Sequence, residues 1–94
     1  MPVVFLPFNL RKYASGAREV EVPGRTLGEL IAGLEKLYPG ISDHLLEEGR
    51  LRPGLAAVCG TTETRQGLRQ PLDEDTEVHF IQAISGGASR QVRQ

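Results

Sequence analysis

With 94 residues, the chain has the length of a single domain, and its 39% hydrophobic and 24% charged residues are ordinary for a globular protein. A net charge of −1 argues against a nucleic-acid-binding surface, and no apolar run approaches the roughly 20 residues that a membrane span needs. The only cysteine, Cys59, excludes an internal disulfide and favours a cytoplasmic protein. Neither it nor His44 and His79 have the paired spacing of a zinc site, so no metal is expected.

The first two segments of the chain predict a β-hairpin. Residues 2–8 (PVVFLPF) are rich in β-forming side chains and apolar on both faces, which favours a strand buried on both sides that weakens at its second proline. Residues 13–16 end in glycine and are typical of a turn. A second strand is expected over residues 17–22, with Val20 and Val22 facing the core.

A long helix is expected next. Thr26 and Glu29 have the spacing of a capping box, in which the threonine caps the helix and the glutamate reaches back to the amide of the cap. Five apolar residues then recur at helical spacing and form one stripe: Leu27, Leu30, Ile31, Leu34 and Leu37. After a proline-glycine stop, residues 42–48 predict a short second helix that is capped by Ser42 and closed by Gly49.

The second half of the chain predicts three further strands. Residues 55–59 (LAAVC) indicate an apolar strand, and residues 67–69 a short edge strand. A polar turn over residues 71–75 has one apolar anchor, Leu72. The last strand is expected over residues 76–83, where apolar and polar side chains alternate.

This order of elements indicates an α+β protein with a mixed sheet of four to five strands, one long helix packed on one face and one short helix. Because crossover connections are right-handed, the first and last strands should be parallel neighbours. The arrangement is that of a β-grasp, or ubiquitin-like, domain, and we expect it to extend over residues 1–84. Residues 85–94 have nothing to bury and should form a flexible tail that contains Gly86 and Gly87.

Three stretches of the sequence resemble the MoaD/ThiS family of ubiquitin-like sulfur carrier proteins. They are residues 3–8 (VVFLPF), the helix start at 26–30 (TLGEL), and residues 71–81 (PLDEDTEVHFI) running into the Ser-Gly-Gly of 85–87. Gly-Gly pairs are common, so the specificity of the resemblance lies in their position after the final strand.

Two features depart from the family pattern. Cys59-Gly60 stands where members often have Asn-Gly, and seven residues follow Gly87, where the double glycine usually ends the chain. Some relatives have such an extension and depend on a metalloprotease of the JAMM type to remove it. The resemblance therefore implies that residues 88–94 are a removable extension.

The resemblance also implies a sulfur carrier without a catalytic site of its own. Once residues 88–94 are removed, an E1-like adenylating enzyme would activate the carboxylate of Gly87, and sulfur would displace AMP to give a thiocarboxylate. That group would donate sulfur to an accepting enzyme of cofactor or amino-acid biosynthesis. The carrier would bind no cofactor, because its activating partner uses the ATP and the sulfur source. Gly86 and Gly87 suit a narrow channel because they lack side chains.

We expect the partner-binding surface at the end of the last strand, formed by Ile81 with Phe80 and Ile84. If Val78 and Phe80 belong to the core, strand alternation turns Ile81 outward beside the tail. A single exposed apolar side chain is common on any surface, but a large one is also a typical interface anchor. The resemblance implies that an apolar residue here docks on the activating enzyme.

Two other functions fit the same residues. In the first, the processed Gly87 forms an isopeptide bond with a target lysine, and the protein is a ubiquitin-like modifier. In the second, the tail is never processed, and the chain is a non-catalytic β-grasp interaction domain. The sequence does not distinguish which biosynthetic pathway would receive the sulfur.

Overall fold

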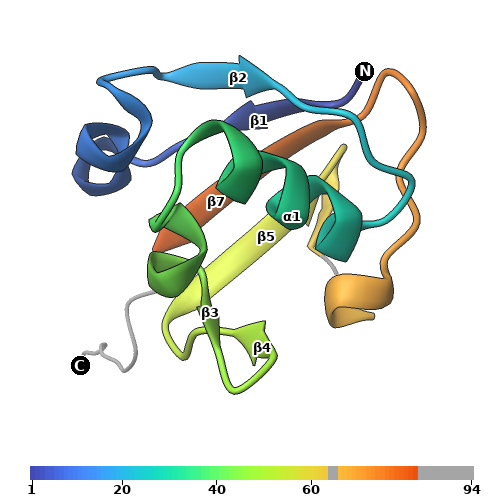
Figure 1. Ribbon diagram of the computed structural model, residues 1–94. Helices are drawn as coiled ribbons and strands as arrows, with labels where there is room; N and C mark the ends of the chain where they lie inside the picture. The colour runs from blue at the N-terminus through green and yellow to red at the C-terminus, as the bar shows by residue number, and fades with distance from the viewer. Residues whose placement is uncertain (64–65, 83–94) are drawn as a thin grey trace, which may run out of the picture.

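A five-stranded mixed sheet organises the chain in the computed structural model, which describes residues 1–63 and 66–82 (Figure 1). The strand order is β2-β1-β7-β5-β6. The strands are β1 (Val3–Phe5), β2 (Glu19–Glu21), β5 (Leu55–Cys59), β6 (Thr62–Glu63) and β7 (Glu77–Gln82). As predicted, the first and last of them, β1 and β7, are parallel neighbours, while the other pairs in this sheet are antiparallel.

Helix α1 (Leu27–Leu37) lies against one face of this sheet (Figure 1). The predicted cap is present, because the backbone N–H of Glu29 donates to Oγ1 of Thr26 at 3.2 Å. The return bond differs from a capping box, since Oε1 of Glu29 accepts from the backbone N–H of Arg25 at 2.9 Å. The glutamate therefore satisfies the amide one residue before the cap, and it still ties the incoming loop to the first turn of the helix.

The core lies between α1 and the sheet. The helix contributes Leu27, Leu30, Ile31 and Leu34, all buried as predicted, and the sheet contributes Val4, Ala57, Val78 and Phe80. Leu72 anchors the turn before β7 in the same core, as its sequence pattern predicted. Burial of apolar side chains on one face of the sheet and one side of the helix accounts for the two-layer arrangement.

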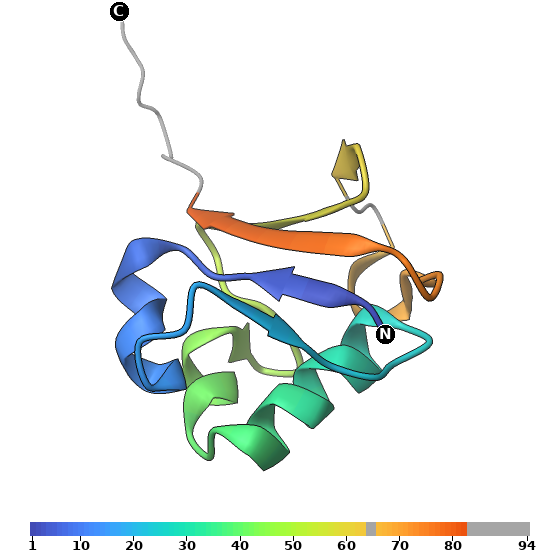
Figure 2. The ribbon, with the colours of Figure 1, turned by 90° about the horizontal axis from the view of Figure 1, so that it is seen from above.

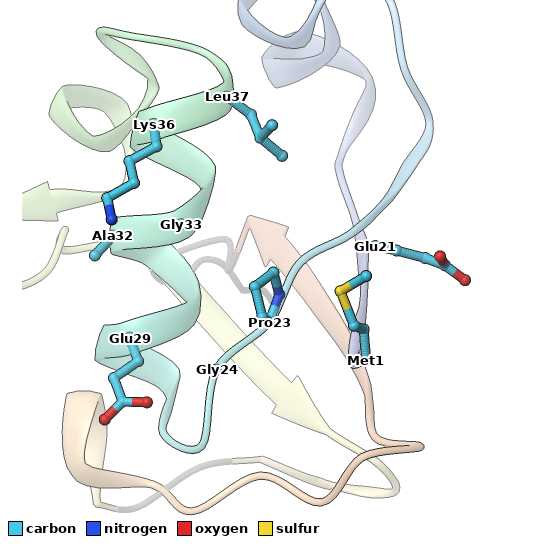
Figure 3. A pocket seen from close by; sticks show the side chains of 9 residues that line it. All are labelled: Met1, Glu21, Pro23, Gly24, Glu29, Ala32, Gly33, Lys36 and Leu37. Atoms are coloured by element: carbon cyan, nitrogen blue, oxygen red, sulfur yellow. The ribbon is translucent and has the colours of Figure 1, made fainter.

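Leu37 was expected to continue the apolar stripe, and this prediction is wrong, since its side chain is 53% exposed. At 3.6 residues per turn, Leu37 lies about 70° from the centre of the stripe that the four buried residues form. It instead borders a hollow of about 630 Å³ whose opposite wall contains Met1 and Pro23 (Figure 3).

A seven-residue 3₁₀ helix, η1 (Phe8–Ala14), separates β1 from β2. The sequence predicted a strand up to residue 8 and only a turn at 13–16, so η1 is a correction. Leu10 and Ala14 are both buried, and their four-residue spacing is the helical signal in this segment. The turn itself is present, since Ser15 and Gly16 both have positive φ.

Two short segments also differ from the prediction. The expected helix over 42–48 is limited to η2 (Ile41–His44), and a hairpin of β3 (Leu46–Glu47) and β4 (Arg50–Leu51) follows. The two turn residues of this hairpin, Glu48 and Gly49, have φ of 54° and 77°. Positive φ at both positions is typical of the two-residue turns that connect the strands of a hairpin.

The edge of the main sheet also differs from the expectation. The short strand expected at 67–69 is the 3₁₀ helix η3 (Gly67–Arg69), which packs against α1. The edge strand is β6, a few residues earlier in the chain, and it pairs with β5. Gly67 has a φ of 61°, which a strand residue does not adopt.

Candidate functional site

The site predicted from the sequence is the tail after β7, together with the surface at its root. The described part of β7 ends at Gln82, so Ile84, Gly86 and Gly87 lie outside the described residues, and their roles stay predictions. What the structure describes is the surface from which the tail departs. This surface is formed by β7, the neighbouring strands and η1 (Figure 2).

Strand β7 alternates between the two faces of the sheet. Val78 and Phe80 are buried in the core, with Phe80 only 1% exposed, whereas Ile81 is 47% exposed. The predicted outward orientation of Ile81 is therefore confirmed. The prediction that Phe80 contacts a partner is wrong for this fold, because its side chain packs in the core beneath α1.

The sheet face that α1 does not cover has an apolar row across its central strands. Phe5 of β1 and His79 of β7 are register partners, and their rings stack with centroids 4.3 Å apart and planes 4° from parallel. Val58 of β5 is the partner of His79 on the other side, and Ala56 is the partner of Ile81. Since partners across a sheet share a face, these five residues form one surface, which we call the outer face.

A hollow of about 350 Å³ lies between the outer face and η1. Ile81, His79 and Phe5 of the outer face line it, together with Arg11 of η1 and Arg18, which directly precedes β2. The sequence alone missed Phe5, Arg11 and Arg18 as candidate site residues. The period-2 pattern indicates which residues share a face of one strand, but only the register between strands brings these side chains together.

The described residues bring few reactive groups together. Within residues 1–63 and 66–82, no three histidine, cysteine, aspartate or glutamate side chains gather as metal ligands would. Cys59 is half-buried at the end of β5, and burial raises the pKa of its thiol, which disfavours the nucleophilic thiolate. Nε2 of His79 lies 3.6 Å from Oε1 of Glu77 in an exposed pair, a type of contact that contributes little to stability.

No helix in the described part of the chain is long and apolar enough to cross a membrane.

Comparison with known proteins identifies the family. No protein-family model matches the chain. The sulfur carrier protein CysO of Mycobacterium tuberculosis and that of Mycobacterium bovis are each 30% identical to it over 89 residues, covering 89% of this chain and 96% of theirs. The chain belongs to the family of ubiquitin-like sulfur carrier proteins. The predicted membership of a MoaD/ThiS-type family is thereby confirmed.

Solved structures of CysO and of a small archaeal modifier protein have the same fold. The crystal structure of M. tuberculosis CysO superposes with a TM-score of 0.86 at 28% identity, and the match covers 89% of this chain and 100% of that one. A chain of the Amycolatopsis orientalis BexX/CysO complex gives 0.85 at 26% identity, with 93% and 100% covered. The small archaeal modifier protein SAMP1 of Methanosarcina acetivorans, at 24% identity and a TM-score of 0.76, shares the fold. The β-grasp prediction is confirmed, and the protein is a sulfur carrier.

Proposed function

We propose that this sulfur carrier works through the carboxylate of Gly87, which an E1-like adenylating enzyme activates after a JAMM-type metalloprotease removes residues 88–94. The observation that carries the proposal is the similarity to the sulfur carrier CysO over 89 residues. The positions of Gly86 and Gly87, four and five residues after Gln82 at the end of β7, support it. The BexX/CysO complex gives a precedent for a relative that assembles with another protein.

The proposed reaction has two steps. The carboxylate of Gly87 attacks the α-phosphate of ATP, which releases pyrophosphate and leaves an acyl-adenylate. A sulfide equivalent then attacks the acyl carbon and expels AMP, so that one oxygen of the carboxylate is replaced by sulfur. In the full chain the carbonyl carbon of Gly87 is part of the amide bond to Ala88, so Gly87 has no free carboxylate to react. Hydrolysis of that bond therefore has to precede adenylation.

The division of labour between carrier and partner follows from this chemistry. The activating enzyme uses the ATP and the sulfur source, and the carrier binds no cofactor and performs no catalysis itself. The thiocarboxylate is then delivered to a sulfur-accepting biosynthetic enzyme. A fully extended tail over residues 84–87 reaches roughly 13 Å, at about 3.3 Å per residue, which suits insertion into a deep active site. We place this exchange in the cytoplasm, where ATP is available and Cys59 stays reduced.

Docking is assigned to the outer face rather than to Phe80. Ile81 is the large exposed apolar residue beside the root of the tail, and Phe5 and His79 extend the surface next to it. A partner that covers these side chains would hold β7 at a fixed distance from its active site. Contact at this point then positions Gly87 without any reacting group on the carrier.

The test compares the full-length protein with a form that ends at Gly87. Both are incubated with the activating enzyme of the same organism, ATP and sulfide, and their intact masses are recorded. We expect only the Gly87-terminated form to exchange one oxygen for sulfur. Equal conversion of both forms without cleavage would overturn the processing step, and lysine-linked adducts in place of a thiocarboxylate would favour a protein modifier.

A further inference from the structure

The most exposed large apolar side chain among the described residues is Phe8, at 83% exposure, on the first turn of η1. Folding gains almost nothing from an aromatic ring that remains in water. The neighbouring Arg11 lies against this ring, with its guanidinium carbon 5.8 Å from the ring centroid. Nε of Arg11 also donates to the backbone carbonyl of Leu6 at 3.1 Å, which restrains the position of the side chain.

Three cations line one hollow together with this ring: Arg11, Lys12 and Arg18. In residues 1–63 and 66–82, none of the three forms an ion pair with a carboxylate, and Glu19 is the acidic residue that lines the hollow beside them. Lys12 is held near an aromatic ring as well, since its Nζ lies 5.2 Å from the centroid of Tyr13. In a chain with a net charge of −1, this is a local excess of positive charge.

These residues adjoin the surface assigned to docking. Arg11 and Arg18 line the hollow that contains Ile81, and they also line a second hollow of about 640 Å³ that contains Phe8 and Lys12. Figure 2 shows η1 beside the end of β7 from which the tail departs. The two hollows therefore form one continuous surface that runs from Phe8 to Ile81.

We propose that Phe8, Arg11, Lys12 and Arg18 form a second docking element, the basic-aromatic surface, which binds an acidic surface of the activating enzyme with an apolar pocket for Phe8. This inference rests on the proposed function. A buried aromatic anchor surrounded by charged residues is the usual composition of an interface hot spot and its rim. Opposite charge on the partner accelerates association and orients the carrier, so that the tail meets the active site.

An acidic protein explains these features better than a nucleic acid does. Three cations beside Glu19 are few compared with the extended basic surface that phosphate binding uses, and the net charge of the chain is negative. The position of the surface at the root of the tail also relates it to the protein that receives the tail. Binding of single-stranded DNA is nevertheless included below, as a result that would overturn the proposal.

The charge test uses the Gly87-terminated protein and ATP–pyrophosphate exchange by the activating enzyme. We expect Lys12→Glu and Arg18→Glu each to raise the activating enzyme's KM for the carrier by about tenfold, with little change in kcat. The reason is that charges at the rim of an interface act mainly on the rate of association. The increase in KM should shrink as ionic strength rises from about 0.05 M to about 0.5 M, because the shorter Debye length screens the attraction between exposed charges on the two proteins. Lys36→Glu makes the same charge change at an exposed position of α1 and should leave the KM for the carrier unchanged.

The aromatic test compares two exposed apolar residues. Phe8→Ser should raise KM at least as much as the charge variants, whereas Leu37→Ser, on the far end of α1, should not. Neither should lower the melting temperature appreciably, so a folding defect is distinguishable. Unchanged KM in all variants, or charge-dependent binding of a fluorescent single-stranded oligonucleotide with unchanged KM, would overturn the basic-aromatic surface. If the unsubstituted Gly87-terminated form supports no exchange at all, the proposed function itself fails.

Discussion

At the scale of single residues, the carboxylate of Glu35 connects the last turns of α1 to the segment that follows it. Oε2 accepts from the backbone N–H of Gly40 at 2.8 Å, and Oε1 accepts from that of Ser42 at 3.0 Å. These two amides precede or begin η2, where a short helix has no internal acceptor for its first N–H groups. The hydrogen bonds from Gly40 and Ser42 lower the pKa of Glu35 below its usual value.

The lowered pKa predicts a pH-dependent contribution to folding. A carboxyl group with a depressed folded-state pKa contributes stability above its unfolded-state pKa and loses it as the pH falls through the folded-state value. We therefore expect Glu35→Gln to be less stable than the unsubstituted protein at pH 7. Their difference in unfolding free energy should shrink as the pH falls below the ordinary value of 4.5. Urea unfolding at a series of pH values measures this, and a difference that stays constant into acid would contradict it.

At the scale of elements, two glycines in the loops are required for different reasons. A Cβ on Gly24 would lie 2.7 Å from the backbone nitrogen of Leu30 and 2.9 Å from its Cα, so this glycine allows the loop after β2 to approach α1. Gly49 has open space around its Cα but a φ of 77°, so it is required by the hairpin turn between β3 and β4. The first position excludes a side chain, and the second restricts backbone conformation.

Asparagine substitutions should distinguish these two requirements, because asparagine tolerates the left-handed conformation but has a side chain. Gly49→Asn should stay within about 0.5 kcal/mol of the unsubstituted protein. Gly24→Ala should cost about 1–3 kcal/mol, and Gly24→Asn at least as much, because fixed backbone atoms of α1 lie in the way. Chemical denaturation measures both free energies, and a tolerated Gly24→Asn would mean that the loop can move away from the helix.

The elements that the sequence predicted well are those that bury one face. The apolar repeat and the Thr26 cap predict α1, and β5 is found at the predicted residues because its run is apolar and flanked by turn residues. The short elements were not predictable in this way. Glu48-Gly49 is equally compatible with a helix end, and only the pairing of β3 with β4 selects the hairpin. In η1, Leu10 and Ala14 have helical spacing, but a pattern of two residues is too short a signal to outweigh the β-rich residues before them.

The site was predictable to a similar extent. Strand alternation predicts the exposure of Ile81, and the resemblance to a family points to Gly87, which lies outside the described residues. The neighbours of Ile81 come from β1 and η1, far away in the sequence, so they could not be predicted from local patterns. Phe5 and Arg11 join the surface only because β1 pairs in parallel with β7.

At the scale of the whole molecule, the central strand β7 contributes to the core on one face of the sheet and to the proposed docking surface on the other. It pairs with β1 on one side and β5 on the other, so its position is fixed by both neighbours. Phe80 packs in the core beneath α1, and the next residue, Ile81, faces the opposite side. Because the two faces have separate contacts, stability and partner binding should respond to different substitutions in this one strand.

A pair of adjacent substitutions tests this separation. Phe80→Ala should cost about 3–5 kcal/mol of stability, because it leaves a cavity in a core that cannot close around it. Ile81→Asp should cost no more than about 1 kcal/mol, because the site is half-exposed and the loss is mainly one of strand preference. Removal of an interface anchor typically costs about 2 kcal/mol or more of binding free energy. Ile81→Asp in the Gly87-terminated protein should therefore raise the activating enzyme's KM for the carrier roughly 30-fold in ATP–pyrophosphate exchange. Melting temperature and exchange kinetics are measured on the same preparations. If Ile81→Asp unfolds the protein, or if it folds and exchanges normally, then Ile81 does not have the docking role that its exposure beside the tail assigns to it.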